Sequence, residues 1–271
     1  MDAESAQQSP NFERDYIFEA FYQRWGAECG IDYGTLATMW RESASLMPED
    51  SPEFGYHNAW HIRATLWAAM EICDREEDIN PALILNRRVL TLGAMYHDAG
   101  YSEDSQSHGF DSKEAYSAHL MTLLAPLHGF TADEIAVASN IIMATKLNTA
   151  PQTAEERVMI EADIANTGQD YEADFKPAFL QLAREDAAKK AAVNLEYSFA
   201  AFGENSIKVL CTYLGYLDKN SLFVKQAVAN IRRLAGELAA EQHMPVLKYI
   251  LKLKNATVIK VLGYRLPFKR N

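Results

Sequence analysis

Apolar residues recur every three or four positions along most of the chain, the spacing that places them on one face of an α-helix. Alternation of apolar and polar residues, which marks a half-buried β-strand, is nearly absent. Proline and glycine gather between the periodic segments, where they interrupt helices. The pattern therefore predicts an all-α fold, built as a single helical bundle with a C-terminal helical extension.

Each periodic segment predicts one helix, and the breaks between segments set the expected ends. Two polar stretches, residues 47–55 and 99–111, are expected to be loops. The predicted helices cover residues 12–28, 31–47, 57 to beyond 70, 80–98, 112–124, 131–146 and 153–168, and at least three more follow to about residue 254.

Several of these segments carry residues that favour helix ends. Thr131 and Glu134 have the spacing of a capping box, in which side chains and backbone groups bond reciprocally at the first turn. Thr153 and Glu156 repeat that spacing. Three single signals are an N-cap at Asp32, a proline in the first turn at Pro81 and a C-cap at Gly168.

No linker and no repeat of fixed period divides the 271 residues. We therefore expect a flexible N-terminus over 1–11, one helical domain over 12–243 and a basic extension over 244–271. The extension contains seven lysine and arginine residues and no acidic residue. Three roles stay open for it: packing on its own acidic domain or in an oligomer, which we favour, docking a partner, or lying on an anionic membrane.

Composition narrows the setting in which the chain works. The formal net charge is −11, which argues against binding to DNA because such proteins usually carry a basic excess. The three cysteines lie far apart, so they indicate neither a disulfide framework nor a cysteine zinc site. No run approaches the ~20 apolar residues of a membrane span. These features favour a cytoplasmic protein.

Two short segments combine histidine with its neighbours in a way that packing does not require. In YHNAWH, His57 and His61 are four positions apart and would share one face of a helix that begins at or before His57. A later start would place only His61. In YHDAGY, His97 and Asp98 end an apolar helix, and Asp163 supplies another carboxylate near a helix end.

Imidazole nitrogen and carboxylate oxygen together suit a divalent ion such as Mn²⁺, Fe²⁺, Co²⁺ or Zn²⁺, with Mg²⁺ favoured where oxygens dominate. A single histidine on an apolar helix is more often an ordinary hydrogen-bonded residue than a ligand. Asp163 alone would be a solvated charge or a cap. The residues by themselves indicate a His/Asp metal site and no particular reaction. We interpret the remaining histidines as ordinary residues: His108, His119, His128 and His243.

The order of the motifs adds a resemblance. The blocks YHNAWHIRATL, LGAMYHDAGYS, SKEAYSAHL, IIMATK and ADIANTG follow one another along the chain. This order resembles the HD superfamily of metal-dependent phosphohydrolases, whose H…HD…D pattern binds a divalent cation inside a helical bundle. The opening Y-H-N-x-x-H motif is similar to that of bacterial HD phosphohydrolases and of cyclic-nucleotide phosphodiesterases. The resemblance covers roughly residues 12–242 and implies an HD-type bundle.

Matched position by position, the resemblance implies that His61, His97, Asp98 and Asp163 bind the metal ion. His57 matches the histidine that stands beside the metal in the phosphodiesterases and protonates the leaving oxygen. Asp98 would also take part in catalysis, as the natural bridge to a second ion.

Three further residues are expected near the substrate or behind the ligands. Glu114 matches an acidic residue that orients a ligand or a water molecule, unless it is an exposed helix carboxylate. Lys146 and Arg63 would neutralise phosphate charge, although a lysine at a helix end also suits solvent, and Arg63 is only two positions from His61. Binuclear members carry extra histidines where this chain has Lys146 and Asn148, which argues against a second protein-bound ion.

The resemblance implies a metal-dependent phosphohydrolase that acts on a phosphomonoester or phosphodiester of a nucleotide or related small molecule, with metal-activated water as the nucleophile. Two alternatives stay open. One is an HD-type di-iron oxygenase, which needs two irons. The other is a non-catalytic or signalling HD module whose basic tail binds a membrane or a partner. The substrate, the metal and the oligomeric state are not determined by the sequence.

Overall fold

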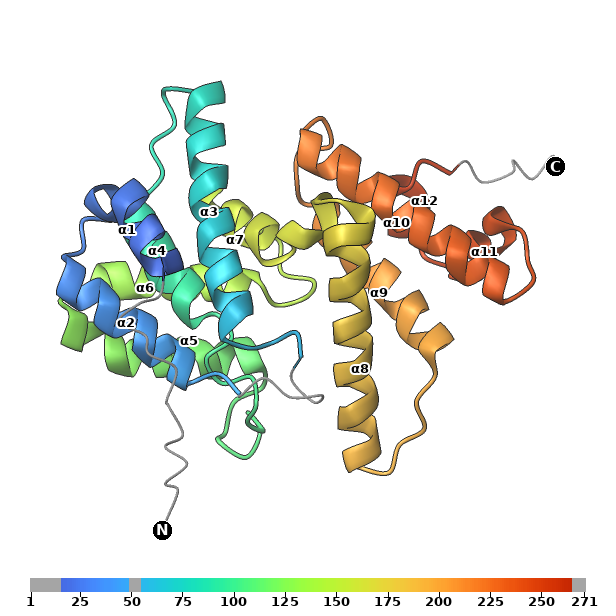
Figure 1. Cartoon of the computed structure of the whole chain (residues 1–271), viewed down its shortest axis with the longest axis horizontal. Coiled ribbons are helices and arrows are strands. Elements are labelled where there is room, and N and C mark those ends of the chain that lie inside the picture. The colour runs from blue at the N-terminus through green and yellow to red at the C-terminus, as the bar shows by residue number, and fades with distance from the viewer. Residues whose placement is uncertain (1–15, 49–54, 265–271) are drawn as a thin grey trace, which may run out of the picture.

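The computed structural model describes residues 16–48 and 55–264, and every regular element within them is a helix (Figure 1). The predicted all-α fold is confirmed. The α-helices of the first half are α1 (Tyr16–Cys29), α2 (Tyr33–Ser45), α3 (Ala59–Ile79), α4 (Arg87–Tyr96), α5 (Lys113–Leu124), α6 (Ala132–Ala144) and α7 (Ala154–Asp163).

The second half begins with a short 3-10 helix and a short π-helix and continues with the α-helices α8 to α12. In Figure 1, α8 stands between the helices of the first half and the group formed by α10, α11 and α12. The elements are η3 (Ala165–Gly168), η4 (Tyr171–Phe175), α8 (Lys176–Ala192), α9 (Phe199–Leu214), α10 (Leu222–Glu241), α11 (Val246–Lys252) and α12 (Ala256–Val261).

Helix α4 lies at the centre of the first hydrophobic core and contacts every other α-helix of the first half. Its residues from Val89 to Tyr96 are all buried, as are Trp25 on α1 and Leu66 on α3. A helix buried on all sides has little freedom to shift, because each displacement would open voids in a close-packed interior. The residues that follow α4 are therefore held in a fixed position.

A second hydrophobic core forms among η4 and α8 to α12, with Ile207, Ile231 and Tyr249 fully buried. The junction between the two cores is the turn η3, which packs against α10. Asn230 on α10 donates to the backbone carbonyls of Thr167 and Gln169. These bonds tie the chain after α7 to the second core.

Several predicted ends hold, and two do not. Asp32 caps α2, and Thr131 and Glu134 form the complete capping box of α6. The helix predicted from residue 80, with Pro81 in its first turn, begins only at residue 87 because Asn86 caps it and the preceding residues form a turn. The predicted helix start at residue 12 and the flexible terminus over 1–11 lie outside the described residues.

The sequence predicted a helix C-cap at Gly168. In the structure Gly168 is instead the last residue of η3. Its position has another physical cause. A Cβ atom at residue 168 would overlap the aromatic ring of Phe223 on α10. A larger residue at this position would therefore require the ring of Phe223 to move.

The basic extension over 244–271 contains α11 and α12, and both pack on the same chain. Tyr249, Ile250 and Val258 are fully buried in the second core, and Lys252 Nζ lies 2.7 Å from Glu204 Oε1 on α9. The boundary expected after residue 243 therefore divides residues that share one core. No α-helix in 16–48 or 55–264 has both the length and the apolar character that a bilayer span requires.

Candidate metal centre

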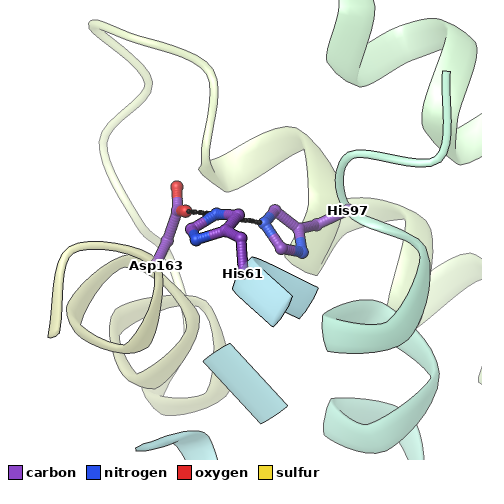
Figure 2. Close-up of side chains that lie close together, drawn as sticks. All are labelled: His61, His97 and Asp163. Atoms are coloured by element: carbon purple, nitrogen blue, oxygen red, sulfur yellow. Dashed lines mark hydrogen bonds and ion pairs between the residues drawn. The ribbon is translucent and has the colours of Figure 1, made fainter. Parts of the chain in front are cut away.

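Three helices bring the predicted ligands to one point. Asn58 caps α3 by accepting two backbone N–H groups of the first turn, which fixes His61 there. His97 directly follows α4, Asp98 is the next residue, and Asp163 is the last residue of α7. Because α3 packs against both α4 and α7, the side chains converge, as Figure 2 shows for His61, His97 and Asp163.

The distances between the candidate ligand atoms are similar to those in a four-coordinate metal site. His61 Nε2 lies 3.3 Å from His97 Nε2 and 3.0 Å from Asp163 Oδ1. Asp98 Oδ2 lies 3.6 Å from His61 Nε2 and 3.4 Å from His97 Nε2. Ligands of a four-coordinate ion with bonds of about 2.1 Å lie roughly 3.4 Å apart. His61, His97 and Asp163 each place a ligand atom within 4.8 Å of the others, so these three side chains can hold one divalent ion, and Asp98 lies beside the two histidines.

A backbone carbonyl determines how His97 presents its ring. Nδ1 lies 2.9 Å from the carbonyl oxygen of Ala94, and donation of its proton there leaves Nε2 toward the other ligand atoms. Burial lowers the pKa of His97, but the carboxylates of Asp98 and Asp163 raise it to about 10. The position attracts a cation, and a divalent ion would replace the proton.

The second oxygen of Asp98 faces a lysine. Lys113 is the first residue of α5, and its Nζ lies 3.1 Å from Asp98 Oδ1. Burial raises the pKa of Asp98, but Lys113 and His97 lower it well below the usual range, so the carboxylate is ionised. Asp98 therefore offers one oxygen to an ion and the other to Lys113. An ammonium group stands where the predicted bridge to a second ion would lie.

The centre is closed on most sides and opens beside Asp163. The side chains of His97, Asp98 and His61 expose 1%, 4% and 7% of their area, and that of Asp163 exposes 22%. Asp163 and His57 both line a cavity of about 370 Å³, within the size range of small-molecule sites. The geometry thus leaves an approach for a substrate, which a catalytic metal site requires.

His57 lies before α3, since that helix begins at Ala59, yet its ring still reaches the cavity. The ring stacks on Tyr101 with 3.8 Å between centroids and lies 5.5 Å from the ring of His61. Its Nδ1 is 2.7 Å from Oε1 of Glu185 on α8, and the Oε2 of the same carboxylate accepts the His57 backbone N–H at 3.1 Å. Glu185 therefore fixes both the ring and the backbone of His57.

The protonation state of His57 follows from this burial. Burial lowers the pKa of His57 to about 4, although the bond to Glu185 raises it. Burial also raises the pKa of Glu185, but His57 and Lys189 hold it below its usual range. At neutral pH a neutral imidazole thus donates Nδ1–H to an ionised carboxylate, and Nε2 carries a lone pair. In the resting protein His57 is a proton acceptor, whereas the phosphodiesterase resemblance implies a donor.

Glu114, Lys146 and Arg63 were predicted to lie near the substrate or behind the ligands. Of these three, only Glu114 lines the cavity. It lies in the first turn of α5, lines the cavity and is 8% exposed. The alternative of an exposed helix carboxylate is therefore wrong.

Arg63 and Lys146 do not reach the cavity. Arg63 lies over the rings of Trp40 and Trp60, 5.3 and 5.2 Å from their centroids, because a residue two positions from His61 faces another side of α3. Lys146 Nζ lies 3.7 Å from Oδ2 of the exposed Asp111 at the surface. Both side chains are therefore unsuited to contact a phosphate bound at the centre.

Other charged residues, which the sequence did not single out, line the cavity instead. Lys189 Nζ lies 2.8 Å from Glu185 Oε1 and 3.8 Å from the ring centroid of Tyr101, and Lys113 Nζ lies 4.4 Å from the same centroid. Lys113 carried a signal, since a helix N-terminus favours acidic residues and disfavours lysine. Glu185 and Lys189 carried none, because an acid and a lysine four apart are typical of an exposed helix pair.

The histidines interpreted as ordinary residues have ordinary partners where the structure gives them. His128 Nε2 lies 2.7 Å from Glu42 Oε2, and His108 Nε2 lies 2.7 Å from Glu103 Oε2. Neither pair belongs to the metal centre.

No family model, no curated protein and no solved structure matches this chain. Its chemistry must therefore be argued from its own side chains.

Proposed function

We propose that this protein is a metal-dependent phosphohydrolase that cleaves a phosphoester of a small molecule. The observation that supports this proposal best is the clustering of His61, His97 and Asp163, whose ligand atoms lie 3.0–3.5 Å apart, with Asp98 Oδ2 at 3.4–3.6 Å from the two histidines. The same residues have the H…HD…D order that resembles HD phosphohydrolases. A cavity of small-molecule size adjoins them and carries lysine side chains.

A divalent ion bound by the four side chains would polarise a phosphoryl oxygen and lower the pKa of the attacking water. The chain supplies the remaining positive charge. Lys113 and Lys189 line the cavity, so their ammonium groups can approach the other phosphoryl oxygens. Since each lysine is already paired with a carboxylate, its position is fixed before the substrate arrives.

His57 moves the proton in the proposed reaction. Its Nε2 accepts a proton from the water that attacks phosphorus and returns it to the leaving oxygen as the ester bond breaks. Glu185 keeps hold of Nδ1–H and stabilises the imidazolium while the proton is on the ring. The net change is the addition of one water molecule across the P–O bond.

The di-iron oxygenase alternative is less well supported. A second ion would need Asp98 Oδ1, which faces Lys113. The chain also has Asn148 where binuclear HD proteins carry histidine. We therefore propose hydrolysis at one ion.

The test uses the purified chain loaded with Mn²⁺, Co²⁺, Mg²⁺ or Fe²⁺ and offered p-nitrophenyl phosphate, its bis ester and a panel of nucleotides. We expect hydrolysis that a chelator abolishes and that Asp98→Asn removes. The control is Asp111→Asn, which makes the same change at an exposed aspartate and should leave activity intact. Hydrolysis that survives Asp98→Asn, or that needs no ion, would contradict the proposal.

A further inference from the structure

The cavity beside the metal centre continues between α8 and α9, where its lining changes from charged to apolar. The ring of Phe179 on α8 lies 6.5 Å from that of Phe175 and 5.3 Å from that of Phe202 on α9. These contacts join the two helices into one apolar wall. The apolar wall consists of Phe175, Phe179, Leu182, Phe202, Val209 and Leu210.

Part of this wall is not covered by the protein. Leu182, Val209 and Leu210 are only partly buried although they line the cavity, and Ala178 beside them is partly buried as well. Apolar surface inside a cavity is unfavourable while water touches it and becomes favourable when an apolar ligand group covers it. The wall therefore suits a ligand that brings a hydrocarbon or aromatic group.

The other end of the same cavity is charged. Asp163 belongs to the metal centre, and Lys113, Lys189 and His57 surround the approach to it. Glu114, Glu185 and Asp186 line the cavity as well. A ligand that fills the cavity thus meets lysines, carboxylates and the candidate metal site at one end and the apolar wall at the other.

We infer that the substrate is an amphiphilic phosphoester whose leaving alcohol carries an alkyl or aryl group. Its phosphoryl group lies at the metal centre, and its apolar group lies against the wall between α8 and α9. This inference rests on the proposed phosphohydrolase function and replaces the nucleotide expected from the resemblance. The apolar wall offers no hydrogen-bond partner to the hydroxyl and base groups of a nucleoside, and the polar lining of the cavity, including Asn166, Asp186 and Tyr213, lies outside this wall.

The polar residues of this region do not change the inference. Asn205 and Ser206 also line the cavity from α9, between Phe202 and Val209 in the sequence. Asn205 is exposed, so it stands at the rim of the cavity. An apolar group can therefore pass these side chains and still cover the wall.

The experiment that tests this inference measures binding and hydrolysis separately. Methyl-, butyl- and octylphosphonate, which cannot be hydrolysed as esters, are titrated by calorimetry into the Mn²⁺-loaded chain. We expect the affinity to rise about threefold to fourfold per added methylene until the cavity is filled. Adenosine monophosphate should bind no more tightly than methylphosphonate. The matching alkyl phosphates are assayed for phosphate release.

A pair of variants tests whether the apolar group of the ligand lies against the apolar wall. Ala178→Phe puts a ring into the space beside the wall and should reduce the ratio of octyl to methyl affinity at least tenfold. Ala191→Phe makes the same change at an exposed position of α8 and should keep the wild-type ratio. Circular dichroism checks that both variants fold. The chain-length series is measured on the wild-type protein and does not depend on either variant.

The outcomes separate the two proposals. Affinity that rises with chain length and depends on residue 178 supports the amphiphilic substrate, even if no ester is hydrolysed, which would contradict only the phosphohydrolase function. Affinity independent of chain length, or preference for the nucleotide, overturns the inference even if the esters are hydrolysed. Absence of binding by all phosphonates contradicts both.

Discussion

The two hydrophobic cores contribute to the site in different ways. The first core, built from α1 to α7, positions every predicted metal ligand at the end or in the first turn of a buried helix. The second core, built from η4 and α8 to α12, provides the apolar wall of the cavity and the carboxylate of Glu185. The first half thus supplies the candidate ligands and part of the cavity lining, and the second half supplies the rest of that lining.

The difference shows why the two parts have different residue types. A ligand set tolerates little displacement, because metal bonds differ in length by only a few tenths of an ångström. Buried helices supply that rigidity. A pocket wall needs shape and apolar surface rather than fixed ligand angles, so partly exposed leucine and valine side chains serve it.

The largest expected effect comes from removing a ligand of the first core. His61→Ala should lose the ion and lower hydrolysis about a thousandfold, since a bound ion contributes several kcal/mol to the transition state. Metal analysis and turnover measured on the same sample test this expectation. His119→Ala changes an exposed histidine on α5 and serves as the control. A His61→Ala protein that keeps its ion would place the centre elsewhere.

The next effect concerns the contact between the cores and depends on pH. The pKa of His57 is about 4 in the folded chain and about 6.5 when unfolded, so the unfolded state takes up the proton first as pH falls. The contribution of His57 to stability is therefore complete above pH 6.5 and is lost as pH falls toward 4, by at most about 3 kcal/mol. His57→Gln should remove that loss.

Urea unfolding at neutral pH and near pH 4.5 measures the His57 effect, with His119→Gln as the matched control. Glu185 does not obscure the result, because its lowered pKa moves its own titration below this window. If His57→Gln loses as much stability between the two pH values as the wild-type protein does, His57 is not buried as described.

A smaller effect tests whether the second core contributes to turnover without holding the metal ion. Glu185→Gln keeps the shape of the side chain but loses the charge that holds His57, so turnover should fall about 10- to 100-fold while the ion stays bound. Turnover and metal content are measured together. Glu71→Gln on α3, which removes one partner of an exposed ion pair with Arg24, is the control. Loss of the ion from Glu185→Gln would mean that the second core also holds the metal.

The smallest effect concerns the junction of the cores. Asn230→Ala leaves the carbonyl of the buried Thr167 and that of Gln169 without this donor, which should cost about 1–3 kcal/mol of stability. Because that turn follows Asp163, metal affinity should weaken as well. Denaturant unfolding and metal titration measure both changes. Asn220→Ala, at an exposed position, should change neither.

His61, His97 and Asp98 were singled out as candidate ligands from short segments of the sequence. His61 lies four positions after His57, and the pair His97–Asp98 directly follows an apolar helix, whereas Asp163 alone carried no such signal. Such signals extend over only a few residues, so they can be recognised in a single sequence. The resemblance to HD phosphohydrolases then joined the segments into one ligand set, and the structure brings the same side chains together.

Local signals failed where distant packing decides the outcome. The apolar run before α4 predicted helix from residue 80, but Leu85 is buried in a connection whose backbone N–H bonds to Glu77 at the end of α3. Gly168 suggested a helix cap, but it ends η3, and a Cβ atom there would overlap the ring of Phe223 on α10. The start of α4 depends on the cap Asn86 and the bond to Glu77, whereas the crowding at Gly168 comes from a residue far along the chain.

What the sequence by itself determined is the helical fold and several helix ends of the first half, since periodicity and caps are properties of neighbouring residues; it also singled out His61, His97 and Asp163 as candidate ligands. Only the tertiary structure decided which groups surround those ligands. Glu185 is 128 positions from His57, and Lys113 is 15 positions from Asp98, so no spacing rule connects them. The physical reason is that burial, charge pairing and cavity shape arise from packing between segments, and packing is a property of the folded chain alone.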